Sequence, residues 1–385
     1  MQKPIIVSFL ATLAVLAIPT THLTATQITM SWSPVVNPNN APDPTTGYGA
    51  VNYSYNIGTY DVTASQYVAF LNCNDPTGAN RLSLYFTGMS NPFFGGVNFN
   101  SSAPAGQMYS VIPGSGNHPA NWVSWYDAIR FANWMDNGQV PGATETGAYT
   151  LLGDTPIPSN ALTITRNPGA TIFLPTEDEW YKAAYYNPAT SSYFLYPSSS
   201  NSAPAATSPT AIPNSANYYG GPNNLTDVGA YTETTSPNGA FDMGGDVWQW
   251  DETLIDSIYR GNLGGSFISS SLLARSSVPG SLAPTSVYDE VGFRLASISP
   301  VPEPSTAVLA LLCFGVALWW RWRFKRSATS LLAFGASTTG RRHTPRAAPI
   351  DRKSRFVRLL AIPVSLTRAM LPVLLPRCRP LRSTL

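Results

Sequence analysis

The chain has 385 residues, of which only 11% are charged, and its formal net charge of +2 averages two very different parts. Residues 27–300 hold 7 Lys and Arg against 19 Asp and Glu, a net charge of −12, whereas residues 321–385 hold 15 cationic residues against one acid. This asymmetry argues against one globular body, and a surface at −12 repels phosphates, which excludes nucleic-acid binding as the main role of residues 27–300.

The first 26 residues have the layout of a secretory signal peptide. One cation, Lys3, precedes an apolar run over residues 5–18, and small polar residues follow at 24–26. The run is shorter than the ~20 residues that a membrane-spanning helix needs. The alternative is a buried first helix, but Pro19 ends the run and no polar face exists. The sequence therefore predicts a mature chain that begins near Gln27, outside the cytoplasm.

Residues 27–299 are enough for one large domain with a buried core. Short apolar clusters alternate with Pro, Gly, Ser, Thr and Asn, and long stretches of helical periodicity are rare. This pattern predicts a loop-rich α+β domain. Short strands or a hairpin are expected within residues 138–167, and a surface loop is expected over residues 191–213.

Three helices are signalled by capping boxes, in which a Ser or Thr and a residue three positions later exchange hydrogen bonds with each other's backbone. The boxes begin at Thr63, Ser124 and Thr176, and the second helix is expected to end near Asn137. We expect acidic residues in the first turn of all three helices, where the helix dipole favours them. That placement gives a structural role to the three acids of the third helix, Glu177, Asp178 and Glu179.

An apolar segment near the other end of the chain reads as a membrane anchor. Residues 306–320 contain no charge, Trp319 and Trp320 stand at the end of the run, and Arg321 begins a cluster of cations. Interfacial tryptophans and a positive stop signal predict a membrane segment whose C-terminal side is cytoplasmic.

Residues 301–326, with Pro302-Glu303-Pro304 before the apolar segment and the Arg cluster after it, resemble the PEP-CTERM sorting signal. The resemblance implies processing by an exosortase-type enzyme, and it implies a protein that is exported and anchored in the membrane or released to the cell surface.

The basic tail over residues 327–385 has no sustained amphipathic period. It is expected to be either a disordered cytoplasmic chain or an artefact of a gene prediction that reads through the true stop codon. The alternative is a tail that binds nucleic acid or anionic lipid.

The three cysteines lie in three different parts of the chain. Cys73 belongs to the exported part, Cys313 to the apolar segment and Cys378 to the tail. Disulfides and cysteine-based metal clusters are thereby excluded within residues 27–299. Cys73 is predicted to be a buried, unreactive thiol in the first helix.

Ordered sequence blocks across residues 55–297 resemble the formylglycine-generating enzyme (sulfatase-modifying factor) family. The blocks include Tyr60-Asp61-Val62-Thr63, His118-Pro119, Ser124-Trp125-Tyr126-Asp127, Leu174-Pro175-Thr176-Glu177, Gly244-Gly245-Asp246-Val247-Trp248-Gln249-Trp250, Gly264-Gly265-Ser266-Phe267 and Gly292-Phe293-Arg294. The resemblance implies a C-type-lectin-like formylglycine-generating-enzyme fold, with small sheets, helices and long loops.

The chemistry implied by the resemblance is oxidation of a sulfatase cysteine with copper held by two thiolates. The matching positions here are Ser269 and Ala274, which supply no soft ligand, so copper is not expected. A related branch holds iron through histidines, but His118 is the one histidine within residues 27–299 and cannot form a triad. No catalytic residue is therefore predicted. The alternative is an oxidoreductase of the formylglycine-generating or non-haem iron type, with a changed metal site, acting on a protein or small substrate.

Calcium is the cofactor that the resemblance leaves open. Asn217, Asp246 and Gln249 match ligand-bearing positions of the family, with Asp and Gln in place of the usual Asn and Glu. Calcium prefers six to eight oxygen ligands that include carboxylates, so the first change favours binding and the second weakens it. The alternative is that these side chains only stabilise turns.

The sequence predicts a binding or structural module. A pocket near Trp248, Trp250, Ser269 and Arg275 would hold a peptide or a polysaccharide unit, with core packing as the alternative for the tryptophans. A further hypothesis is a matrix component that is secreted with exopolysaccharide.

Overall fold

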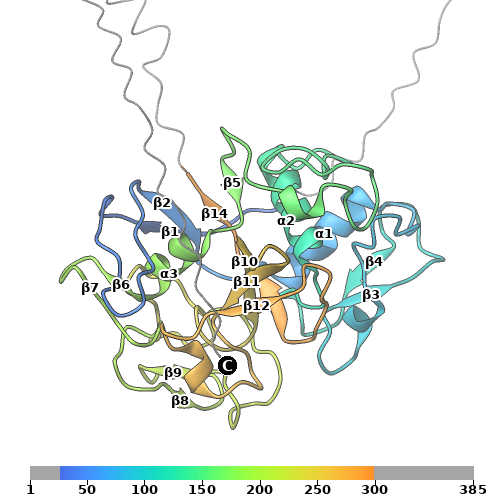
Figure 1. The fold of residues 1–385 in the computed structure, drawn as a ribbon. Helices are drawn as coiled ribbons and strands as arrows, with labels where there is room; N and C mark the ends of the chain where they lie inside the picture. Colours follow the sequence, from blue (N-terminus) through green and yellow to red (C-terminus); the bar gives the residue numbers. More distant parts are fainter. Residues whose placement is uncertain (1–26, 299–385) are drawn as a thin grey trace, which may run out of the picture. The chain divides into compact units, whose positions relative to one another are not determined.

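The computed structural model describes residues 27–298, which Figure 1 draws in colour. The predicted signal peptide (1–26), the sorting signal with its apolar segment, and the basic tail lie outside the described residues. Within residues 27–298, no helix combines the length and the apolar character that crossing a membrane requires.

The three capping boxes are confirmed, and each begins a helix: α1 (Ala64–Asn74), α2 (Trp125–Asp136) and α3 (Glu177–Tyr185). Helix α2 ends at the predicted position, with Asn137 as its C-cap. The expectation of acids in every first turn is correct for α2 and α3 and wrong for α1. Helix α1 uses the neutral Gln66 as the reciprocal partner of Thr63, so its start is capped by hydrogen bonds without a charge.

Two small sheets form the centre of the domain. The first is antiparallel, with the order β1 (Trp32–Val35), β2 (Tyr55–Gly58), β14 (Ala296–Ser297) and β5 (Ile172–Phe173). The second has the order β12 (Gly280–Leu282), β11 (Tyr259–Leu263), β10 (Trp248–Ile255) and β13 (Val291–Phe293), of which β10 and β13 are parallel. Both sheets are therefore completed by strands from the end of the domain.

The remaining regular elements are short. Three two-stranded pairs are β3 (Val97–Phe99) with β4 (Tyr109–Val111), β6 (Tyr186–Asn187) with β7 (Ser192–Tyr193), and β8 (Ala205–Ala206) with β9 (Ser215–Ala216). Single 3-10 turns are η1 (Thr87–Ser90), η2 (Ala161–Thr163) and η3 (Ser271–Ala274). The mixed, loop-rich α+β architecture is thus confirmed.

Neither the hairpin nor the short strands expected within residues 138–167 are formed. The segment contains η2 and one isolated bridge between Tyr149 and Arg166. Asn160 accounts for the difference, because its side-chain oxygen accepts from Leu152 N (3.0 Å) and its amide donates to Thr150 O (2.9 Å). These local bonds hold a turn where ladder hydrogen bonds would otherwise run.

Residues 191–213 are largely exposed, as predicted for a surface loop, although they include the short strands β7 and β8.

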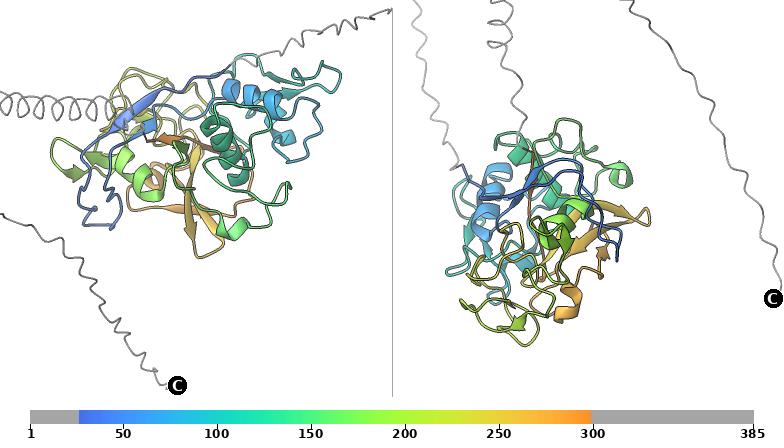
Figure 2. Two further views of the ribbon diagram at one scale, coloured as in Figure 1. Left: turned by 90° about the horizontal axis from the view of Figure 1, so that it is seen from above. Right: turned by 90° about the vertical axis from the view of Figure 1, so that its left-hand side faces the viewer.

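The core is rich in aromatic side chains. Helices α1 and α2 lie side by side (Figure 1, Figure 2), and Phe70 of α1 meets Phe131 of α2 with ring centroids 5.3 Å apart. Phe131 in turn meets Phe293 of β13 edge to face, also at 5.3 Å. Such ring pairs add to the stabilisation that burial of their area provides. The helix pair is thereby fixed against the second sheet.

Arg294, the residue that follows β13 in the sequence, connects the two sheets. Its guanidinium is fully buried and donates to the Gly58 carbonyl (2.9 Å), to the carbonyls of Phe241 and Asp242 (2.9 and 3.1 Å) and to Gln249 Oε1 (2.6 Å). Its Nη2 also lies 3.1 Å from a carboxylate oxygen of the buried Asp61. One side chain therefore connects β2, β10 and the 241–242 loop.

Candidate functional site

Two consecutive glycines place the residues that follow strand β11. Gly264 and Gly265 have φ values of +103° and +74°, a region that residues with a side chain rarely adopt. A Cβ on Gly264 would also lie 3.0 Å from the Met243 carbonyl oxygen. The turn they form directs Ser266 into the protein and begins the loop that carries Ser269.

Ser269, one of the two positions matched to copper thiolates, belongs to a chain of hydrogen bonds between oxygen atoms. The hydroxyls of Ser266 and Ser269 are 2.9 Å apart, and the Ser266 hydroxyl donates to Glu290 Oε2 at 2.5 Å. Both serines are buried. The second matched position, Ala274, is fully buried, and its carbonyl accepts from the Tyr185 hydroxyl at 3.0 Å. Hydroxyl and carboxylate oxygens are hard donors, unlike the thiolates that select Cu(I).

The other residues of the predicted pocket differ in burial. Trp250 is fully buried, and its indole N–H donates to the Val123 carbonyl at 3.0 Å, so this side chain is part of the core. Trp248 and Arg275 are half-buried, and the Arg275 Nε has no hydrogen-bond partner among the described residues.

Apolar side chains flank Ser269 on the surface instead. The backbone N–H of Tyr219 donates to the Ser269 carbonyl at 2.9 Å, and Tyr219 is 71% exposed. Ile268 precedes Ser269, Leu272 follows it in η3, and both are about half exposed. We call these three residues, together with Ser269, the Ser269 face. No pattern in the sequence indicates this face, because Tyr219 is fifty residues from Ser269 along the chain.

Asn217 and Asp246, two of the three residues matched to calcium ligands, lie together. The Asn217 amide donates to Asp246 Oδ1 at 3.0 Å, and the backbone and hydroxyl of Thr226 donate to the same carboxylate. Gln249 is bound elsewhere. Its Oε1 accepts from Trp180 Nε1 (2.7 Å) and from Arg294, and its amide donates to the Asp242 carbonyl (2.7 Å). With its oxygen taken by two donors, Gln249 is not available to the Asn217 and Asp246 pair.

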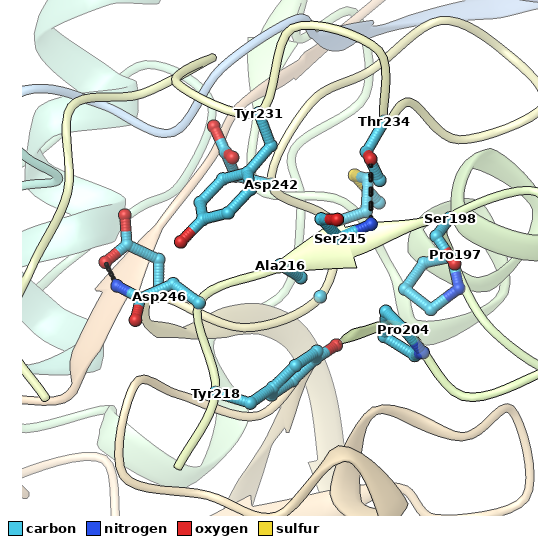
Figure 3. A pocket seen from close by; sticks show the side chains of 13 residues that line it. Pro197, Ser198, Pro204, Ser215, Ala216, Tyr218, Tyr231, Thr234, Asp242 and Asp246 are labelled. Carbon is cyan, nitrogen blue, oxygen red and sulfur yellow. Dashed lines mark hydrogen bonds between the residues drawn. The ribbon is translucent and has the colours of Figure 1, made fainter. Parts of the chain in front are cut away.

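Asn217 and Asp246 line a small cavity, shown in Figure 3, with a volume of about 20 Å³. That volume suits a single water molecule or a single ion. Asp242 and Asp246 lie on one side of it in the figure, and Tyr218 lies on the other. Three lining oxygens have no hydrogen-bond partner among the described residues, namely Ser215 Oγ, Asn217 Oδ1 and the Tyr218 hydroxyl. Buried polar atoms are rarely left unpaired, so the unpaired oxygens of this lining are suited to bind a water molecule or a cation.

The two carboxyl groups at this cavity favour protonation when no cation is nearby. Burial raises the pKa of Asp246 well above its usual value, and the neighbouring Asp242 raises it further. Burial likewise raises the pKa of Asp242 to about 6. A cation between them would reverse this preference, because it stabilises the charged carboxylates.

The remaining candidate ligands stand apart. His118 Nε2 lies 3.7 Å from an Asp227 carboxylate oxygen, and burial lowers the pKa of His118. Cys73 is buried in α1, as predicted, and burial raises the pKa of its thiol. Within residues 27–298, no group of three or more His, Cys, Asp and Glu side chains is arranged to hold a metal ion.

Two family models match the chain. A model described as a sulfatase-modifying factor enzyme 1-like domain matches residues 38–298, and one described as a PEP-CTERM protein-sorting motif matches residues 300–326. Comparison with curated proteins found no match.

Several solved structures are similar to the chain at low sequence identity. Treponema denticola variable protein 1 is 18% identical with a TM-score of 0.48, and the match covers 71% of this chain and 97% of that one. CarF has the same identity and TM-score, with 71% and 100% covered. PvdO from Pseudomonas aeruginosa is 16% identical with a TM-score of 0.38, and 70% and 92% are covered.

Proposed function

Because the chain belongs to the sulfatase-modifying factor enzyme 1-like family and carries a PEP-CTERM sorting motif, we propose that it is an exported binding module. The sorting motif indicates export and exosortase processing at the cell surface. The family domain supplies a C-type-lectin-like scaffold on which loops carry the binding residues. The function that we assign to this scaffold is to bind a partner molecule at the cell surface, without copper chemistry.

The observation that carries this proposal is the Ser269 face. Exposed Tyr, Ile and Leu side chains that gather at one place mark a surface that a partner covers. Tyr219 is bonded through its backbone to Ser269, Ile268 and Leu272 lie within three residues of it in the chain, and all three expose their side chains near the position that corresponds to a copper thiolate in the family. Their chemistry suits a polypeptide segment with apolar side chains, and the hydrogen-bonded pair of Ser266 and Ser269 lies beneath them.

Copper binding tests the loss of the family's chemistry. We expect the exported protein to bind no stoichiometric Cu(I), because Ser269 and Ala274 offer no thiolate. The matched control is the double variant Ser269→Cys with Ala274→Cys, which restores both thiols and should gain Cu(I) binding. Titration against a chromophoric Cu(I) chelator measures both proteins. Tight stoichiometric binding by the unmodified protein that disappears in Ser269→Ala would show that a changed oxidase site survives.

A calcium ion is the cofactor that we propose for the small cavity. The ligands would be Asn217 Oδ1 and the carboxylates of Asp242 and Asp246, with water completing the shell and without Gln249. An ion at this place would hold the 215–218 segment against the 242–246 loop, which is a stabilising role. The unpaired Asn217 oxygen and the two carboxylates in a cavity of ion size support this assignment.

Millimolar Ca²⁺ is expected to raise the melting temperature of the protein by on the order of 5 °C, through its preference for the folded state. Asp242→Asn should abolish this rise, because it removes one negative charge from the cavity. Asp256→Asn is the control, since Asp256 is exposed on another loop and has a similar positive φ (47° against 53°). Differential scanning calorimetry with Ca²⁺ or EDTA measures the shift. An equal rise in the wild-type and Asp242→Asn proteins would place the ion elsewhere.

A further inference from the structure

A second and larger cleft opens at the start of helix α2. Its volume is about 440 Å³, within the range typical of small-molecule sites. The first turn of α2 supplies the floor through Tyr126 and Asp127, and residues 80–87 supply one wall. The cleft shares no lining residue with the Ser269 face or with the small cavity.

The wall around Pro156 and Ile157 is fixed from inside the protein. The fully buried Arg130 of α2 donates to the carbonyls of Thr155 (2.7 Å) and Pro156 (3.1 Å) and forms an ion pair with Glu145 (2.7 Å). Hydrogen bonds to a charged donor are about twice as strong as neutral ones. This side of the cleft is therefore held rigidly.

The two other walls are also preformed. The Asn80 side chain bonds to both the N–H and the carbonyl of Tyr85 (3.0 and 2.7 Å), and the Tyr67 hydroxyl donates to the Leu84 carbonyl (2.7 Å). The segment that contains Thr285 and Val287 is joined to the chain before α2 at both ends. Trp125 N donates to Pro284 O (3.0 Å), and Trp122 N donates to Tyr288 O (2.9 Å). A cleft with three fixed walls requires little ordering when a ligand binds.

The lining presents flat apolar faces beside hydroxyl groups. Phe86 is 40% exposed, although its ring packs on Trp122 with centroids 5.5 Å apart, so its outer face is available at a fixed angle. Tyr85 and Tyr126 also line the cleft, although both are largely buried, and no described residue hydrogen-bonds to the hydroxyl of either. The apolar ring faces can cover the C–H face of a bound ring, while the phenol groups can exchange hydrogen bonds with its substituents.

One carboxylate lies at the floor with part of its bonding capacity unused. Asp127 Oδ2 accepts from the N–H and the hydroxyl of Ser124 (2.9 and 2.7 Å), but no described residue donates to its Oδ1. Burial raises the pKa of this carboxyl to about 6. The lining contains no Lys, Arg or His, and the buried Arg130, whose charge acts on Asp127 from behind the lining, is occupied by Glu145 and two carbonyls, so no free cation is offered to an anionic ligand.

We infer that this cleft is a binding site for one neutral sugar unit. The pyranose ring would stack on Phe86, and its hydroxyl groups would donate to Asp127 and exchange hydrogen bonds with the phenol groups of Tyr85 and Tyr126. The inference does not depend on the Ser269 face, and either can fail without the other.

An exposed ion pair connects two walls of this site. Arg81 Nη2 lies 2.5 Å from Asp154 Oδ2, and the two residues stand next to lining residues of opposite walls. Exposed pairs of this kind contribute little to folding.

Sugar titration of the full-length protein tests the inference. The probes are methyl β-glucoside, methyl β-galactoside and methyl α-mannoside. Their binding is measured by saturation-transfer NMR. At least one is expected to bind saturably in the millimolar range. Phe86→Ala should weaken that binding at least tenfold, whereas Phe93→Ala, which removes an equally large exposed ring outside the cleft, should leave it unchanged. Tyr126→Phe keeps the ring and removes one hydroxyl, and it should weaken binding several-fold while the fold stays intact.

Three results would overturn the sugar site. The first is saturable binding of none of the three glycosides, and the second is an equal loss in Phe86→Ala and Phe93→Ala. The third is preferential binding of tetramethylammonium, which would make the aromatic rings and Asp127 a cation site. Copper titration at the Ser269 position reports separately, so it distinguishes failure of this inference from failure of the proposed function.

Discussion

Arg294→Met is expected to lower the free energy of unfolding by on the order of 4 kcal/mol, or to prevent folding altogether. Removing one partner of a buried ion pair leaves the other charge without compensation, which typically costs about 3–5 kcal/mol. Here Asp61, whose pKa burial raises to about 7 even beside Arg294, would lose its charged partner at nearly zero exposure, and the carbonyls of Gly58 and Phe241 would lose the Arg294 donor. Urea denaturation followed by tryptophan fluorescence measures the loss.

The control is Arg275→Met, which removes a half-buried guanidinium that binds no carboxylate among the described residues. It should change stability by less than about 1 kcal/mol. The double variant Arg294→Met with Asp61→Leu should recover part of the loss, because it removes the stranded charge as well. A loss below about 1 kcal/mol in Arg294→Met would contradict the central role of this side chain.

The folded state is expected to lose stability as the pH rises from about 4 to about 8. Burial raises the pKa of Asp251 to about 8 and that of Glu177 to about 7, while an unfolded chain titrates such groups near 4. Between these values the folded state binds the proton more tightly, so its advantage is complete below pH 4 and disappears as the pH passes the folded-state values. Each such group changes the free energy of unfolding by at most ~1.4 kcal/mol per pH unit.

Asp251→Asn should make this dependence on pH shallower, because the asparagine does not titrate. Asp251 is fully buried, and its Oδ2 has no hydrogen-bond partner among the described residues, so its ionised form is poorly solvated. Asp256→Asn, at an exposed position, should leave the dependence unchanged. Urea midpoints measured from pH 4.5 to pH 8.5 compare the three proteins. A stability that rises toward pH 8 in the wild-type protein would contradict the expected sign.

Local signals were sufficient to predict the helices. A capping box involves residues three positions apart, so Thr63, Ser124 and Thr176 can be interpreted without any knowledge of the rest of the chain. The family blocks likewise predicted the mixed, loop-rich fold. The hairpin expected within 138–167 failed because the side chain of Asn160 bonds to nearby backbone, a choice that a pattern of apolar residues does not reveal.

The site depended on contacts between distant segments. Trp250 is one of the predicted binding residues and Gln249 one of the predicted calcium ligands, but their side chains bond to Val123 and to Trp180 in the interior. The Ser269 face requires Tyr219, and the cleft at the start of α2 requires three separate segments, residues 80–87, 156–157 and 285–287, to meet there. Neither arrangement leaves a periodic or motif-like trace in the sequence.

The position of β14 limits the distance between the folded domain and the enzyme that processes the sorting motif. This strand ends at Ser297 between β2 and β5, and the sorting motif matches from residue 300. Even fully extended, the five residue steps from Ser297 to Pro302 span at most ~18 Å. An enzyme that acts at this motif therefore has to approach the folded domain to within a tether of that length. The end of the first sheet at which β14 stops is part of the surroundings in which it must work.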